Sequence, residues 1–150
     1  MADVAGAGLN YVRIPIGYWA IETREGEPYL AKVSWQYVIS ISRAAHNNLT
    51  VSYRYLLKAI KWARKYGIRI NLDLHGVPGT QNRWEHSGRR GTVGWMHGPM
   101  GYANAQRSLD YIRIIAQFIS QPQYKDVVTM FCIINEPFGP DIEIENLQSL

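Results

Sequence analysis

The sequence has a single cysteine, Cys132, so an internal disulfide is excluded. Cys132 lies within an apolar stretch, and we interpret it as a small core residue and not as a nucleophile or metal ligand. No apolar run is long enough to span a bilayer. The first ten residues lack the basic start and the apolar run of a signal peptide. We therefore expect a soluble chain without a membrane partner or an export signal of its own.

Charge of either sign is not in large excess, because 16 Lys and Arg stand against 12 Asp and Glu, which gives a formal charge of +4. Several basic residues share what we interpret as the solvated face of one helix, and no basic run is interleaved with exposed aromatics. We expect no nucleic-acid partner, and nothing in the sequence implies a specific protein partner.

Motifs for bound nucleotides and metals are also missing. The sequence has neither a Walker motif nor a dinucleotide fingerprint after a strand. Three histidines recur at equal intervals, but their spacing is not that of known zinc motifs: His75, His86 and His97. We expect no metal and no cofactor.

The hydrophobic pattern alternates between strands and helices. Strands are predicted at residues 11–17, 68–75 and 127–137, and the third is apolar enough to be buried on both faces. Helices are predicted at 55–66, before Gly67, and at 103–120. The second helix would bury one apolar face: Ala105, Leu109, Ile112, Ala116 and Ile119. This order predicts an α/β fold with a parallel sheet, and the long loops 19–34 and 76–101 suit a binding rim.

Four polar side chains fall at or near the carboxyl ends of these strands, where parallel strands bring them together: Arg13, His75, Asn135 and Glu136. Glu136 follows an apolar strand, so we expect burial to raise the pKa of its carboxyl and make it a general acid. Simpler interpretations stay open. Arg13 would form an internal salt bridge to Asp73, His75 would bond a backbone carbonyl, and Asn135 to Pro137 would be a polar turn.

Three segments resemble glycoside hydrolase family 5, and specifically its fungal exo-β-1,3-glucanases. They are Gly-Leu-Asn-Tyr-Val-Arg-Ile-Pro-Ile-Gly-Tyr-Trp-Ala at 8–20, Leu-Asp-Leu-His-Gly-Val-Pro-Gly-Thr-Gln-Asn at 72–82 and Ile-Asn-Glu-Pro at 134–137. The resemblance implies a partial (β/α)₈ barrel covering strands two to four with their helices. It implies β-glucan as the substrate, glucose as the product, and an extracellular or cell-wall location for the parent family.

The resemblance also implies roles for individual residues. Glu136 would be the proton donor and Asn135 would contact the sugar 2-hydroxyl. Arg13 and His75 would support the nucleophile and the sugar. A loop would wall the first sugar subsite: Asn82, Trp84 and His86. The family's nucleophile is a Glu on the seventh strand, which this chain does not contain, so we expect the chain alone to be inactive. An incomplete barrel leaves unpaired strand edges and exposed apolar faces, so we also expect the chain to be unstable or to aggregate.

The sequence departs from the family at two places. Arg83 stands where the family usually has Gly, at a position that requires a tight turn or close backbone approach. Residues 37–54 have a foreign composition between intact flanks, and we interpret them as an insertion from a retained intron or an erroneous gene model. Two other functions stay open: a catalytically dead module that binds glucan through Trp19, Trp84 and Trp95, and a β-1,4-glucanase or mannanase of the same family.

Overall fold

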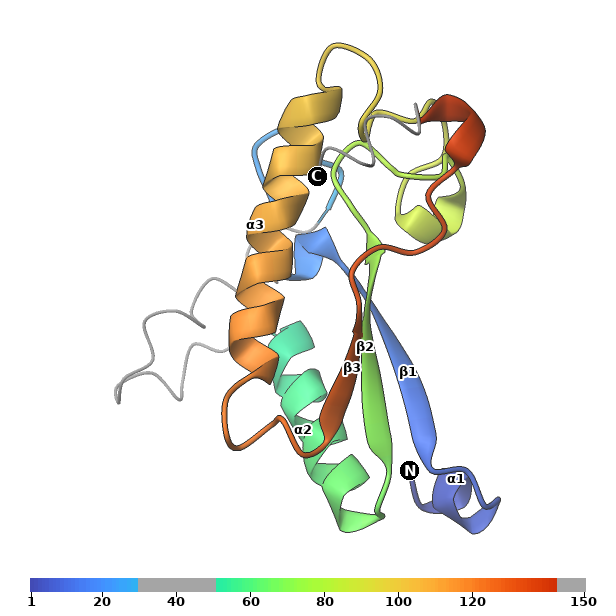
Figure 1. Cartoon of the computed structure of the whole chain (residues 1–150), viewed down its shortest axis with the longest axis vertical. Helices are drawn as coiled ribbons and strands as arrows, with labels where there is room; N and C mark the ends of the chain where they lie inside the picture. The colour runs from blue at the N-terminus through green and yellow to red at the C-terminus, as the bar shows by residue number, and fades with distance from the viewer. Residues whose placement is uncertain (30–50, 143–150) are drawn as a thin grey trace.

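The structure, a computed structural model, describes residues 1–29 and 51–142, with the backbone alone at 51–53 and 141. Most of the predicted insertion at 37–54 lies outside the described residues. The described residues form three parallel strands, three α-helices and three short 3₁₀ turns (Figure 1). The strands are β1 (Tyr11–Gly17), β2 (Arg69–Gly76) and β3 (Val128–Cys132), and the helices are α1 (Ala2–Gly6), α2 (Val51–Lys65) and α3 (Gly101–Ile119). The 3₁₀ turns span Tyr18–Ala20, Glu85–Ser87 and Gly139–Asp141.

The predicted α/β fold with a parallel sheet is confirmed. The sheet has the order β1-β2-β3, and both pairs of neighbours run parallel. The register places Arg13 beside Asn71 and Cys132 beside Asp73. Because all three strands point the same way, their carboxyl ends share one edge of the sheet, where the polar side chains of the sequence motifs lie.

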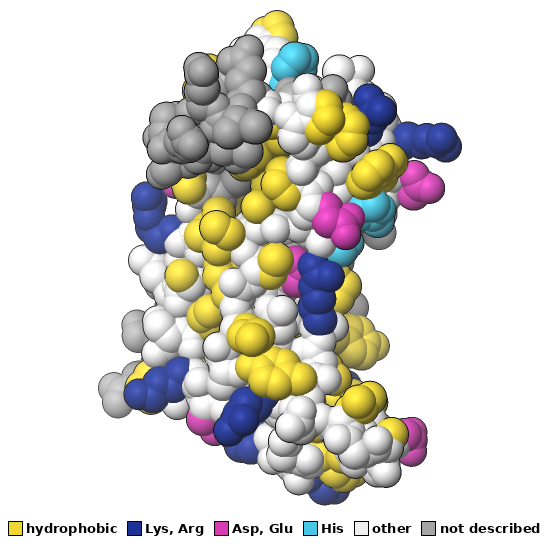
Figure 2. Space-filling model, turned by 45° about the vertical axis from the view of Figure 1, so that its right-hand side comes forward, with side chains coloured by type: hydrophobic (Ala, Val, Ile, Leu, Met, Phe, Trp, Pro, Cys, Tyr) yellow, Lys and Arg dark blue, Asp and Glu magenta, His cyan; other side chains and the backbone are white. Residues whose placement is uncertain are grey.

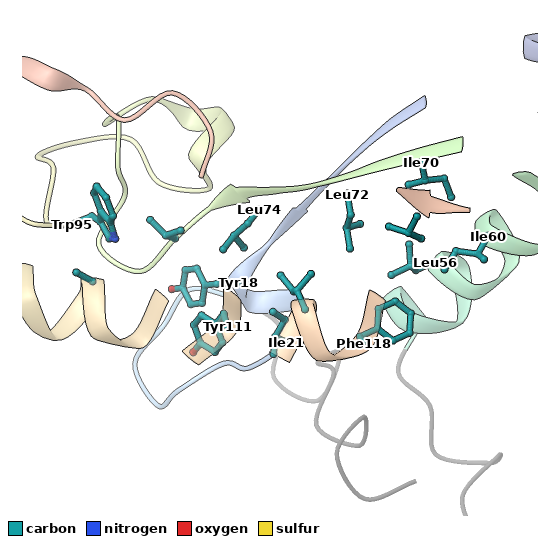
Figure 3. Close-up of a cluster of buried hydrophobic side chains, with 14 of the residues drawn as sticks. Tyr18, Ile21, Leu56, Ile60, Ile70, Leu72, Leu74, Trp95, Tyr111 and Phe118 are labelled. Atoms are coloured by element: carbon teal, nitrogen blue, oxygen red, sulfur yellow. The ribbon is translucent and has the colours of Figure 1, made fainter. Parts of the chain in front are cut away.

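One face of the sheet forms the core of the chain. Ile70, Leu72 and Leu74 alternate along β2, are fully buried and point toward α2 and α3, which cover this face (Figures 1 and 3). Their partners include Leu56, Ile60, Tyr111 and Phe118. Burial of each such aliphatic side chain contributes about 1.5–3 kcal/mol. The strict alternation of β2 therefore anchors the strand and turns its polar residues to the other face.

The opposite face of the sheet is open in the described part of the chain. The expectation that β3 is buried on both faces is wrong, since Thr129 and Met130 are exposed there. The strand also ends at Cys132, short of the predicted Pro137. Cys132 pairs with Asp73 on this polar face, so it is not the apolar core residue that we expected. On this face Arg13 is partly accessible, whereas Asp73 and Asn135 are buried.

The face by which α3 packs agrees with the predicted one only in part, since Ala105 is buried but Ile112 and Ile119 are half-buried against the core. The buried positions include Ala105, Ser108, Tyr111, Ile115 and Phe118, whereas Ala116 is exposed. The two aromatic rings have the largest areas to bury, and the hydroxyl of Ser108 is satisfied by the carbonyl of Asn104 at 2.8 Å. The buried face is therefore rotated about the helix axis by roughly one residue from the predicted aliphatic face. No helix in the described ranges is both long and apolar enough to cross a membrane.

Candidate active site

Four side chains, from β1, β2 and the segment after β3, form a closed ring of polar contacts. Asp73 Oδ2 lies 2.6 Å from His75 Nδ1 and 2.9 Å from the Arg13 guanidinium. Arg13 also donates to Asn135 Oδ1 at 2.6 Å, and the amide nitrogen of Asn135 lies 3.4 Å from His75 Nε2. The predicted convergence of Arg13, His75 and Asn135 is therefore observed, and Asp73 joins them.

The ring also fixes the direction of each hydrogen bond. Because Arg13 has only donors, Asn135 turns its oxygen to Arg13 and its NH₂ group to His75. His75 Nε2 then accepts, and Nδ1 carries the hydrogen that is donated to Asp73. The alternative of a backbone carbonyl as the partner of His75 is wrong, while the salt bridge from Arg13 to Asp73 is confirmed.

Asp73 is the charged centre of this ring. Its side chain is 0% exposed, whereas Arg13 reaches the surface. Burial alone would lower the pKa of the Arg13 guanidinium, but the charge and hydrogen bond of Asp73 raise it above the ordinary value. Burial, followed by contact with Asp73, raises the pKa of the Cys132 thiol, which disfavours a thiolate nucleophile at neutral pH.

Gln81 connects the end of β2 to the segment after β3. Its amide nitrogen donates to the carbonyl of His75 at 2.8 Å and to that of Asn135 at 2.9 Å. Its backbone carbonyl accepts from the N–H of Phe138 at 2.9 Å. The side chain is fully buried, so these bonds hold the Asn135–Phe138 segment where the strand ladder has ended. Sequence reasoning missed this role, because a buried Gln has no periodic signal.

Glu136 follows this ring directly but is not desolvated. Its side chain is 64% exposed, so the burial that we expected is wrong for this structure. The backbone of Glu136 has φ 46°, a left-handed conformation that costs a non-glycine residue of the order of 1 kcal/mol. This conformation turns the chain sharply after Asn135. One carboxylate oxygen lies 3.4 Å from Nε2 of His86, so Glu136 remains on the same edge as the ring.

The loop after β2 supplies the other predicted residues. Asn82 is buried, and its oxygen accepts from the N–H of Trp84 at 3.2 Å while its NH₂ group lies 3.0 Å from His86 Nε2. The indole of Trp84 is 5.5 Å from the His86 ring and 43% exposed. These three residues therefore form a wall beside Glu136, and the ring of His86 is also 5.6 Å from that of His75.

Arg83 adopts the backbone conformation that its position in the motif suggested. Its φ of 59° lies in the left-handed region, which glycine enters without strain. The guanidinium lies 4.6 Å from the centre of the Phe138 ring, which in turn packs edge-on against Trp84. The loop thus keeps the tight turn, and the side chain adds a cation beside the aromatic wall.

The other two tryptophans that we assigned to glucan binding, Trp19 and Trp95, do not face this site. Trp95 is buried and donates its indole N–H to Ser108 at 3.2 Å, so its expected contact with glucan is wrong. Trp19 is half-buried and stacks on Tyr29 with 4.4 Å between ring centres. Its indole also lies against Gly17, Gly76 and Gly88. Within the described residues, no three His, Cys, Asp or Glu side chains are grouped so that they could hold a metal ion.

Comparison with known proteins identifies relatives of this chain, although no family model matches it. The chain is 46% identical over 145 residues to a probable glucan 1,3-beta-glucosidase D of Aspergillus flavus. It is 44% identical over 146 residues to the glucan 1,3-beta-glucosidase D of Emericella nidulans. Each match covers 97% of this chain, which spans only 15% of the length of these relatives.

The fold has counterparts among solved structures. Rutinosidase from Aspergillus niger matches with a TM-score of 0.69 and 21% identity over 91% of this chain and 32% of that one. The structure of AoRut matches with a TM-score of 0.69 and 18% identity, covering 99% of this chain and 40% of the other. At these identities the likeness concerns the fold alone. By sequence, the chain is homologous over nearly its whole length to one segment of the fungal glucan 1,3-beta-glucosidases, as its motifs predicted.

Proposed function

We propose that this chain is part of a retaining glycoside hydrolase of family 5 that releases glucose from β-1,3-glucan, with Glu136 as the proton donor. The observation that carries the proposal is the polar ring of Arg13, Asp73, His75 and Asn135. Glu136 directly follows Asn135 in the sequence. The names of the curated relatives support the substrate class. The parallel sheet with helices on one face supports the second to fourth strands of a (β/α)₈ barrel as its source.

The geometry suits the first half of the reaction. Glu136 donates its proton to the glycosidic oxygen as the bond from that oxygen to the anomeric carbon breaks. A second carboxylate attacks the anomeric carbon, and water later releases the sugar while Glu136 takes a proton back. Asn135, held by Arg13 and Gln81, presents its amide to the sugar 2-hydroxyl, and Asn82, Trp84 and His86 wall the first sugar subsite.

Asp73 does not qualify as that second carboxylate. It is completely buried and already bound to the Arg13 guanidinium and to the imidazole of His75. A nucleophile must reach an anomeric carbon, whereas this carboxylate holds the two side chains in place. We therefore propose that the nucleophile belongs to a larger protein, and that the 150-residue chain alone does not hydrolyse glucan.

Titration of the purified chain with laminaribiose, followed by NMR, tests the sugar site. We expect signals of Arg13, His75 and Asn135 to shift, and Asn135→Ala to abolish the shifts. The control Asn10→Ala removes an exposed amide before β1 and should leave binding unchanged. Laminarin hydrolysis by the chain alone, lost in Glu136→Gln, would contradict the absence of a nucleophile.

A glucan-binding module without catalysis is the second candidate. The exposed indole of Trp84 near the four polar side chains favours it. Glucan pull-down together with a circular dichroism melt separates the two, because a binding module must be folded. A β-1,4-glucanase or mannanase is the third candidate, and competition between laminaribiose, cellobiose and mannobiose in the same titration decides the linkage.

Two further expectations are part of the proposal. We propose that residues 37–54 are not native to the family, and sequencing of spliced transcripts tests this, because reads that contain the segment would contradict it. We propose an extracellular or cell-wall location for the parent protein, which immunolocalisation in intact cells checks.

A further inference from the structure

Hydrogen bonds run in one direction around the polar ring of Arg13, Asp73, His75 and Asn135. Nη2 of Arg13 donates to Asn135 Oδ1 at 2.6 Å and to Asp73 Oδ2 at 2.9 Å. The NH₂ group of Asn135 donates to Nε2 of His75 at 3.4 Å. Nδ1 of His75 donates to the same oxygen of Asp73 at 2.6 Å. Each contact pairs a donor with an acceptor only while Nε2 of His75 carries no hydrogen, so the ring of contacts matches the neutral imidazole.

A second proton on His75 breaks this match. Both nitrogens of an imidazolium are donors, so the Nε2–H group would face the NH₂ group of Asn135. Half a turn of the Asn135 amide about its last side-chain bond would offer the oxygen to His75 with almost no change of shape. The same turn directs the NH₂ group toward Arg13, which has only donors. Asn135 therefore cannot keep both of its partners once His75 is charged.

Arg13 is the partner that has room to move. Its side chain is 48% exposed, whereas the side chains of His75 and Asp73 are 24% and 0% exposed. Asn135 is buried, and Gln81 donates to its backbone carbonyl at 2.9 Å, so its main chain is held while the amide turns. The contact between His75 and Asp73 becomes an ion pair in the charged state, which keeps the imidazolium in place.

Charged groups of both signs surround this ring. Figure 2 shows acidic, basic and histidine side chains next to one another on the face that it presents. The titratable groups near His75 come from each neighbouring element: Arg13 on β1, Asp73 on β2, Cys132 on β3, His86 in the loop after β2 and Glu136 after β3. The two carboxylates favour a proton on the imidazole, whereas the guanidinium and a charged His86 oppose it. What distinguishes the two protonation states is therefore the direction of the hydrogen bonds.

We propose that protonation of His75 is a switch in this site, which turns the amide of Asn135 and releases the guanidinium of Arg13. The switch itself rests only on the contacts of the ring. Its consequence for the substrate rests on the proposed function, in which this amide contacts the sugar 2-hydroxyl. Turning the amide exchanges the donor and the acceptor that the hydroxyl meets, so the charged state binds the sugar more weakly.

Nitrogen-15 NMR of the purified chain tests the switch without sugar. We expect the ring nitrogens of His75, the NH₂ signal of Asn135 and the Nε–H signal of Arg13 to change in one common step as the pH falls from about 8 to about 5. The nuclear Overhauser effect between the Asn135 NH₂ hydrogens and the His75 ring should be present at the higher pH and lost at the lower one. A purely structural ring would keep this effect at both pH values.

Matched variants test whether the amide transmits the change. Asn135→Leu has nearly the same volume but neither donor nor acceptor, so the signal of Arg13 should lose most of its step with pH. Asn10→Leu makes the same substitution at an exposed amide before β1 and should keep the step. A full step of Arg13 in Asn135→Leu would overturn the role of the amide. The measurements on the parent chain decide the switch even where Asn135→Leu does not fold.

Titration with laminaribiose at the same two pH values tests the consequence for the sugar. We expect binding to be about tenfold weaker at the lower pH, as for the loss of one hydrogen bond. A switch seen by NMR without laminaribiose binding at either pH would support the switch and count against the proposed function. Binding at the higher pH, with a His75 that stays neutral to about pH 5 or changes independently of Asn135, would overturn the switch and leave the proposed function standing.

Discussion

Nε2 of His86 lies 3.4 Å from the carboxylate of Glu136, which places the two side chains next to each other at the edge of the sheet. The same nitrogen is 3.0 Å from the NH₂ group of Asn82. The orientation of that amide is set by the N–H of Trp84, which needs the Asn82 oxygen as its acceptor. His86 Nε2 is therefore an acceptor, and the hydrogen of the neutral ring is on Nδ1.

This tautomer can be measured directly. Nitrogen-15 spectra of the His86 ring should show the Nδ1–H form at high pH, and Asn82→Asp should shift it toward Nε2–H because a carboxylate offers only acceptors. His97, which is exposed and not in contact with Asn82 in the structure, serves as the internal control. An Nε2–H tautomer in the parent chain would contradict the assigned geometry.

Asp73→Asn tests the centre of the polar ring. The substitution keeps the shape but removes the charge that two partners face, and we expect a loss of about 2 kcal/mol in the free energy of unfolding. Urea unfolding measures this loss. Asp110→Asn, which breaks an exposed pair with Arg113 at 3.3 Å, should change stability by less than about 0.5 kcal/mol. Equal effects of the two variants would mean that the ring does not stabilise the fold.

A buried cation attaches the loop after β1 to α3. Arg107 lies 2.5 Å from Glu27 and 3.6 Å from Glu22, and it also donates to Tyr111. Burial alone would raise the pKa of Glu27, but the hydrogen bonds and charge of Arg107 lower it. Burial alone would also raise the pKa of Glu22. The hydrogen bond from Tyr111 and the charges of two arginines outweigh burial and lower that pKa.

The pH dependence follows from the sign of these shifts. Lowered carboxyl pKa values in the folded state stabilise it above the unfolded value of about 4.3, and this stabilisation is lost as the pH falls below that value. Arg107→Met should lower stability by about 3 kcal/mol at neutral pH and flatten the acid part of the curve. The free energy of unfolding, measured with urea at intervals of about one pH unit between pH 3 and pH 7, checks this expectation. Arg113→Met should leave the dependence of unfolding free energy on pH as in the parent chain. If Arg107→Met still lost stability steeply at acid pH, Arg107 would not be the cause of the lowered carboxyl pKa values.

Gly88→Ala tests the packing of the Trp19 indole against Gly88. Gly88 has φ 88°, and an added Cβ atom would meet the indole ring directly. We expect a loss of about 1–3 kcal/mol together with a red shift of tryptophan emission, because the ring must move toward solvent. Gly139→Ala, where nothing lies near the added carbon, should leave both measurements unchanged. An unaltered emission spectrum in Gly88→Ala would show that Trp19 does not depend on this glycine.

The sequence was most informative where one periodicity dominated. The strict alternation along β2 predicted its bounds to within one residue and its buried face, and Arg13 was correctly paired with Asp73. Gly67 marked the end of α2 and has φ 67°, as a C-cap glycine requires. These features depend on neighbours in sequence or on one adjacent strand, so the local pattern contains enough information.

Prediction was weaker where distant residues compete. The face of α3 was predicted only in part, because Tyr111 and Phe118 outweigh smaller aliphatic residues once other elements pack against the helix. Trp95 was assigned to the sugar, although its indole N–H bonds Ser108 in the core. Gln81 and Arg107 were missed because buried polar side chains are recognised only when their partners from other segments are known.

The double donation by Gln81 has a practical consequence for protein engineering. The Asn-Glu-Pro tripeptide is not a self-contained cassette, since its placement depends on an amide from a separate loop. Grafting the tripeptide onto another parallel sheet would transfer the carboxylic acid without its orientation, unless that loop were moved with it.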